Sequence, residues 1–141
     1  HYAAHKADKT APYPGIAQLL QHLQAAGVRY GVVTNKDHAA AVGVLQHYFG
    51  SLVPHVQGRI DALPPKPAPD TTHLLMKTLG AAPETTLFVG DSNVDIATAK
   101  AAGLASCGVL WGFRTLGELQ QAGADHIAET PAALQALILG Q

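Results

Sequence analysis

Two aspartates stand four residues apart, directly after a short apolar run. The run is LFVG, and Asp91 and Asp95 follow it in LFVGDSNVD. Residues four apart share one face of a helix, so both carboxylates can face one point. Two such carboxylates repel each other, and a hard divalent cation such as Mg²⁺ removes that penalty. The spacing favours a metal site. The simpler alternative is that Asp91 caps a helix and Asp95 is a solvated first-turn acid.

A second set of polar residues ends the valine-rich run VVTNK. The Thr34 hydroxyl and the backbone N–H groups around Asn35 would lie beside the start of the next helix, where a phosphate is favoured. In the alternative interpretation, the two residues only turn the chain and cap that helix.

Lys66 lies between prolines in PPKPAPD. The prolines stiffen this loop and restrict the ammonium to a narrow range of positions, which suits binding to a phosphoryl group or to clustered carboxylates. An exposed loop lysine is the alternative, and the proline density favours a functional role.

The elements that must position these residues alternate along the chain. The sequence predicts helices at residues 16–27, 37–50, 71–80, 93–103, 115–123 and 130–140, and strands at 28–36, 52–58, 85–90, 104–112 and 124–129. Asp70 is expected to cap the third helix. Alternation with short connections indicates an α/β fold, with a mostly parallel sheet between two helical layers. Ligands bind at the carboxyl ends of such strands, where all three polar sets would meet.

Taken together, TN, KPAPD and GDSNVDIATAKAAG resemble the haloacid dehalogenase-like hydrolase superfamily, and within it the phosphoglycolate phosphatase branch. The resemblance covers residues 13–139 and implies a Rossmann-like three-layer core. It implies that Thr34 binds the transferring phosphoryl group, that Asn35 supports it and that Lys66 neutralises charge. It also implies that Asp91 ligates Mg²⁺, with Asp95 as a second ligand or a partner through water. Members of this family form an aspartyl-phosphate, which water then hydrolyses.

The family's first motif, D-x-D on the central strand, does not occur in this sequence. No two of the aspartates are separated by one residue; they are Asp8, Asp37, Asp61, Asp70, Asp91, Asp95 and Asp125. Residues 1–12 resemble the last cap helix and its return linker, and residues 13–141 an incomplete hydrolase core. We therefore expect the C-terminal part of a longer enzyme, inactive alone. A natural relative without the nucleophile is the alternative.

Without the central strand, the sheet is expected to have an open slot between the strands that end at Thr34 and at Gly90. Unpaired backbone groups there would favour self-association with another copy of the chain.

Composition narrows the function classes. The 141 residues are 48% hydrophobic and carry a formal net charge of −1. This charge does not indicate binding to nucleic acid or to an anionic membrane surface. No apolar run is long enough to span a membrane, and no signal peptide is visible. The single cysteine, Cys107, suits a reducing compartment, so we expect a cytoplasmic protein.

Other residues whose side chains could bind a ligand or react are weaker candidates. Arg114, in LWGFRT, could reach a substrate carboxylate, or it could be structural. His1 and His5 have helical spacing, but a lone pair of this kind is more often a surface feature than a metal site. Cys107 lies in an apolar run and is expected in the core.

The predicted function is Mg²⁺-dependent hydrolysis of a small phosphate ester, with 2-phosphoglycolate favoured by the resemblance. The alternatives are a sugar-phosphate phosphatase or phosphomutase of the same superfamily, or a non-catalytic relative that binds phosphate or a partner protein.

Overall fold

The computed structural model describes residues 13–112 and 114–140. The predicted cap remnant and linker at residues 1–12, with His1 and His5, lies outside the described residues. The helices are α1 (Ile16–Ala25), α2 (His38–Phe49), α3 (Asp70–Leu79), α4 (Asn93–Ala102), α5 (Leu116–Gln121) and α6 (Pro131–Leu139), with short 3₁₀ turns at Gly50–Leu52 and Pro83–Thr85. The strands are β1 (Val32–Asp37), β2 (Val56–Arg59), β3 (Leu87–Gly90), β4 (Ala105–Val109) and β5 (His126–Ala128).

All strand pairs among the described residues are parallel, as predicted. β1 pairs with β2, and β3, β4 and β5 form a second group in that order. Within the described ranges no ladder joins β1 to β3. The sheet is thus divided between β1 and β3, the two strands that were expected to flank the D-x-D strand.

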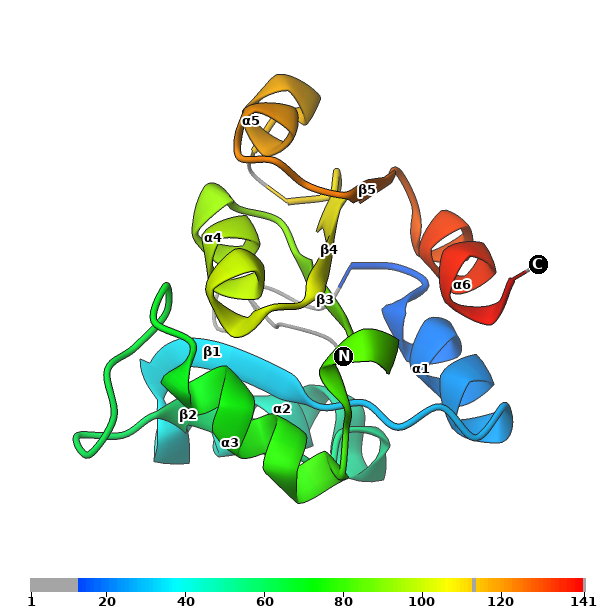
Figure 1. Ribbon diagram of the computed structural model, residues 1–141. Helices are drawn as coiled ribbons and strands as arrows, with labels where there is room; N and C mark the ends of the chain where they lie inside the picture. The colour runs from blue at the N-terminus through cyan, green and yellow to red at the C-terminus, as the bar shows by residue number, and fades with distance from the viewer. Residues whose placement is uncertain (1–12, 113, 141) are drawn as a thin grey trace.

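The strands contribute alternate residues to two hydrophobic clusters, one on each face. Val32 and Val89 join a cluster with the buried faces of α1, α2 and α6. Their neighbours Val33 and Phe88 join a second cluster with α3 and α4. The result is the predicted Rossmann-like three-layer arrangement, with α1 and α6 side by side on one face (Figure 1).

Helix boundaries follow local sequence signals, with one exception. The apolar spacing in α1 buries Ile16, Leu19, Leu20 and Leu23 as predicted. The prediction that Asp70 caps α3 is wrong: Pro69 occupies the cap position and Asp70 is the first helical residue, with no capping hydrogen bond from a side chain. An acid in the first turn still suits the helix dipole.

None of the described helices combines the length and the apolar character needed to cross a membrane.

Candidate functional site

The carboxyl end of β1 holds Thr34 and Asn35, which lie within the strand and are half-buried. The Thr34 hydroxyl oxygen accepts a hydrogen bond from the backbone N–H of Lys36 at 3.2 Å. This local contact fixes the Thr34 side chain at the strand end, where the sequence predicted it.

Asn35 connects β1 to the proline-rich loop that follows β2. Its side-chain Nδ2 donates to the carbonyl oxygen of Lys66 at 3.0 Å, and its Oδ1 accepts from the Lys66 backbone N–H at 2.8 Å. Both polar backbone groups of Lys66 are therefore satisfied by one amide, which fixes the loop against the sheet.

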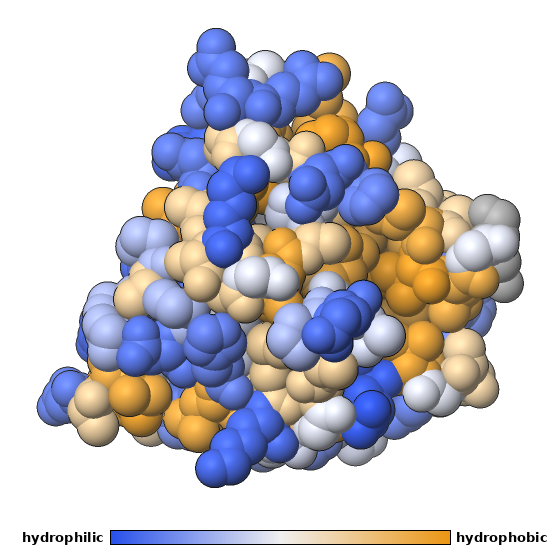
Figure 2. Space-filling model, viewed as in Figure 1, coloured by the Kyte–Doolittle hydropathy of each residue, from blue (hydrophilic) through white to orange (hydrophobic). Residues whose placement is uncertain are grey.

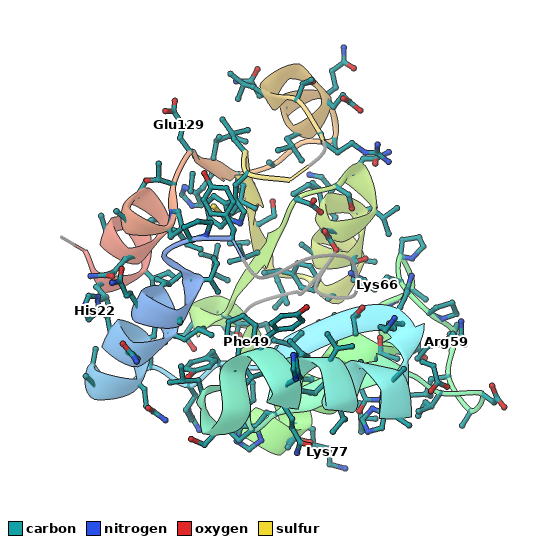
Figure 3. The ribbon with its side chains drawn as sticks, turned by 180° about the vertical axis from the view of Figure 1, so that it is seen from behind. His22, Phe49, Arg59, Lys66, Lys77 and Glu129 are labelled. Atoms are coloured by element: carbon teal, nitrogen blue, oxygen red, sulfur yellow. The ribbon has the colours of Figure 1, made fainter. Side chains whose placement is uncertain are left out.

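The ammonium of Lys66 is buried and paired with Asp95. The distance from Nζ to Asp95 Oδ1 is 2.6 Å, and the two side chains are 7% and 2% exposed. Figure 3 shows Lys66 between β1 and α4. A buried ion pair of this kind needs further hydrogen bonds to offset desolvation. The second oxygen of Asp95 supplies them.

Asp95 Oδ2 accepts from the backbone N–H of Asp91 and from the Ser92 hydroxyl, both at 3.1 Å. The Ser92 hydroxyl in turn accepts from the Asp95 N–H and so caps α4. A Cβ at Gly90 would overlap the Asp95 carboxylate, so glycine is required at the exit of β3. Both oxygens of Asp95 are thus engaged in positioning Lys66 and Asp91.

Asp91 is 1% exposed and lies where β3 ends. Gly112, in the loop after β4, approaches it so closely that a Cβ there would overlap the Asp91 carboxylate. A buried carboxylate at a strand end fits the oxygen-ligand preference of Mg²⁺. Across the described residues, no group of three or more His, Cys, Asp or Glu side chains forms a complete metal site. Asp91 therefore fits as one ligand, whereas Asp95 as a second ligand stays a prediction.

Arg114 is separate from these contacts in the structure. Its side chain is 46% exposed, and its Nε lies 3.9 Å from Glu118 Oε2, one turn further along the chain in α5. Its role toward a substrate stays a prediction.

Cys107 is fully buried in β4. Burial raises the pKa of its thiol to about 11, so it is a core residue, as predicted, and not a thiolate nucleophile.

A cavity of about 460 Å³ lies at the opposite edge of the sheet. It is lined by residues at the amino ends of strands, among them Leu87, Ala105 and His126, and by Leu137 and Ile138 of α6. Figure 2 shows hydrophobic residues gathered on the side of the molecule where α1 and α6 lie. Because ligands of parallel sheets bind at the carboxyl ends, this cavity is not the candidate site.

Sequence reasoning missed two residues of the site. Ser92 was readable as a helix cap before the acid at the third helical position. The sequence signal for Gly112 is weaker, because it is only a glycine that follows β4, the strand that pairs with β3.

A family model for the haloacid dehalogenase-like hydrolases matches residues 1–103. Phosphoglycolate phosphatase from Escherichia coli (strain K12) is 36% identical, over 80% of this chain and 45% of its own length. Phosphoglycolate phosphatase from Rhodospirillum rubrum is 35% identical, over 94% of this chain and 64% of its own length. The chain spans about half the length of the first of these relatives.

Solved structures show the same fold. A Lactobacillus delbrueckii protein assigned as a phosphoglycolate phosphatase has a TM-score of 0.90 and 36% identity, covering 96% of this chain and 58% of the other. A HAD-family hydrolase from Deinococcus radiodurans R1, solved with bound phosphate and sodium, has a TM-score of 0.80 and 25% identity, covering 92% of this chain and 60% of the other.

Proposed function

The chain belongs to the haloacid dehalogenase-like hydrolase family, and we propose that its strand-end site forms part of a Mg²⁺-dependent phosphomonoester hydrolase. One observation carries the proposal: at the sheet edge where Asp91 emerges, the buried Lys66 ammonium pairs with Asp95, and Asn35 binds the Lys66 backbone. A buried cation paired with a carboxylate at a strand end suits phosphoryl transfer, which depends on positioning and charge neutralisation.

Each residue has a defined task in this proposal. Lys66 neutralises charge on the phosphoryl oxygens, and Thr34 donates its hydroxyl hydrogen to one of them. Asp95 keeps Lys66 in place through its 2.6 Å ion pair. The Asn35 side chain holds the same lysine through two hydrogen bonds to the Lys66 backbone.

Asp91 would hold Mg²⁺, with Asp95 as a further ligand directly or through water. The bound cation supplies charge neutralisation on the phosphoryl group. The family resemblance and the buried Asp91 carboxylate support this assignment.

In this proposal the nucleophile comes from outside these 141 residues, because the sequence contains no D-x-D pair. We therefore propose that the chain alone does not turn over phosphate esters. Its cytoplasmic location and its self-association between β1 and β3 stay predictions.

The proposed substrate is 2-phosphoglycolate, supported by the phosphoglycolate phosphatases among its relatives. Its carboxylate is the group that Arg114 would bind.

The test is an assay of a protein that joins this chain to a segment with the D-x-D motif, against a panel of phosphate esters. We expect Mg²⁺-dependent release of phosphate, fastest from 2-phosphoglycolate, and a loss of about 100-fold or more in Lys66→Ala and Asp91→Asn. Faster turnover of a sugar phosphate would support the alternative substrate class. No Mg²⁺-dependent turnover on any ester, or unchanged rates in both variants, would contradict the proposal.

A further inference from the structure

The segment that follows β4 lies against the proposed metal ligand. Gly112 is the point of contact, since a side chain as small as a methyl group there would overlap the Asp91 carboxylate. The position of this backbone segment therefore limits where the Asp91 carboxylate can lie.

A second contact holds the same segment from the other side. Trp111, directly before Gly112, stacks on Tyr13 with ring centroids 5.6 Å apart and an interplanar angle of 26°. Trp111 is partly buried against the cluster that α1 and α6 cover, whereas Tyr13 is 46% exposed. Stacked aromatic pairs of this geometry contribute beyond the area that they bury.

The stack joins the chain segment that leads into α1 to the loop that contacts Asp91. Movement of Trp111 would carry Gly112 with it, because adjacent Cα atoms are about 3.8 Å apart.

We propose that Gly112 and Tyr13 are positioning residues for a divalent cation at Asp91. Gly112 leaves the space that the carboxylate needs, and Tyr13 fixes the Trp111–Gly112 loop through its stack. The inference rests on the proposed function, because it assumes that Asp91 is a metal ligand. Residues that orient a metal ligand in this way commonly change metal affinity without binding the metal.

The chain offers a direct probe, since Trp111 is its only tryptophan and lies next to the site. Terbium(III) bound at Asp91 would luminesce when Trp111 is excited, and Mg²⁺ would displace it. The measurement uses the 141-residue chain and requires no turnover. Asp91→Asn identifies the signal, which should disappear in that variant.

Gly112→Ala should weaken terbium and Mg²⁺ binding by about 10- to 100-fold. The matched control is Gly43→Ala in α2, where a Cβ meets no atom within 4 Å and binding should be unchanged. Tyr13→Ala should weaken binding by about tenfold, and Tyr13→Phe should restore it because the stack needs only the ring.

The outcomes distinguish a failure of this inference from a failure of the proposed function on which it rests. A Mg²⁺-sensitive signal that is lost in Asp91→Asn but unchanged in Gly112→Ala and Tyr13→Ala overturns the inference and leaves the metal site intact. No such signal in the wild-type chain overturns a metal site formed by this chain itself, and the inference with it. If circular dichroism shows that Gly112→Ala does not fold, the Tyr13 pair decides: equal affinities in Tyr13→Ala and Tyr13→Phe overturn the positioning role.

Discussion

Asn35 binds both backbone polar groups of Lys66, donating to its carbonyl oxygen at 3.0 Å and accepting from its N–H at 2.8 Å. One side chain of β1 thereby fixes the loop that carries the buried cation. The cation in turn pairs with Asp95, which binds the Asp91 N–H. These contacts connect the carboxyl end of β1 to that of β3, which share no strand ladder among the described residues.

Replacing Asn35 with aspartate should destabilise the chain. The carboxylate cannot donate to the Lys66 carbonyl, so that half-buried oxygen loses its partner, at a cost of about 1–3 kcal/mol in the free energy of unfolding. Urea denaturation measures the change. The control is Asn93→Asp, the chain's other asparagine, which is exposed at the start of α4 and should tolerate an acid. Equal stability of Asn35→Asp and wild type would contradict the role of the amide.

Lys66 and Asp95 should show strong energetic coupling. Lys66→Met leaves a buried carboxylate without its cation, and Asp95→Asn leaves a buried ammonium without its anion, so each single change should cost about 3–5 kcal/mol. The double variant should cost much less than the sum of the two. A double-mutant cycle of urea denaturation curves measures the coupling energy. Additive effects of the two single changes would show that the ion pair contributes no coupling energy.

Thr72→Val should stabilise the chain. The Thr72 hydroxyl is fully buried and has no hydrogen-bond partner among the described residues, so its removal should raise the free energy of unfolding by about 1 kcal/mol. Thr98 is equally buried, but its hydroxyl donates to the Val94 carbonyl at 2.7 Å, and Thr98→Val is the matched control. Thermal unfolding of both variants should give opposite shifts of the midpoint, and a lower midpoint for Thr72→Val would be inconsistent with the structure.

Asp125 should make stability depend on pH in the acid range. The Ser106 backbone N–H donates to its carboxylate at 2.9 Å and holds the pKa of Asp125 below its ordinary value of 3.8. A lowered folded-state pKa stabilises the fold above 3.8, and the contribution is lost as the pH falls through the folded-state value. Wild type should therefore be more stable than Asp125→Asn at neutral pH, with the difference shrinking below about pH 4. Denaturation curves over this range measure it, and a constant difference would contradict the assignment.

The sequence was informative where periodicity or caps decide the structure. The spacing of Leu19, Leu20 and Leu23 predicted both α1 and its buried face. β1 begins at Val32, four residues later than predicted, although the whole run from Val28 is rich in β-forming residues. Arg29 instead donates to the carbonyl oxygen of Leu79 at 2.7 Å, a long-range contact that no local pattern reveals.

The candidate site was likewise predictable from the sequence only in part. Thr34, Asn35, Lys66, Asp91 and Asp95 were predicted from three short motifs, because strand ends of a parallel sheet meet at one edge. Their hydrogen bonds were not, since the bond from Asn35 to the Lys66 backbone depends on the path of a loop 31 residues away. The contact of Gly112 with Asp91 likewise depends on the register between β3 and β4.

The central claim is that Lys66 and Asp91 act together on a phosphoryl group. Titration of the 141-residue chain with inorganic phosphate, followed by phosphorus NMR, tests it without any residue beyond those present. We predict that phosphate binds, that Mg²⁺ strengthens the binding, that Lys66→Met abolishes it, and that Asp91→Asn removes the effect of Mg²⁺. Phosphate binding that is equally strong in Lys66→Met and in the wild-type chain, with or without Mg²⁺, would contradict the account.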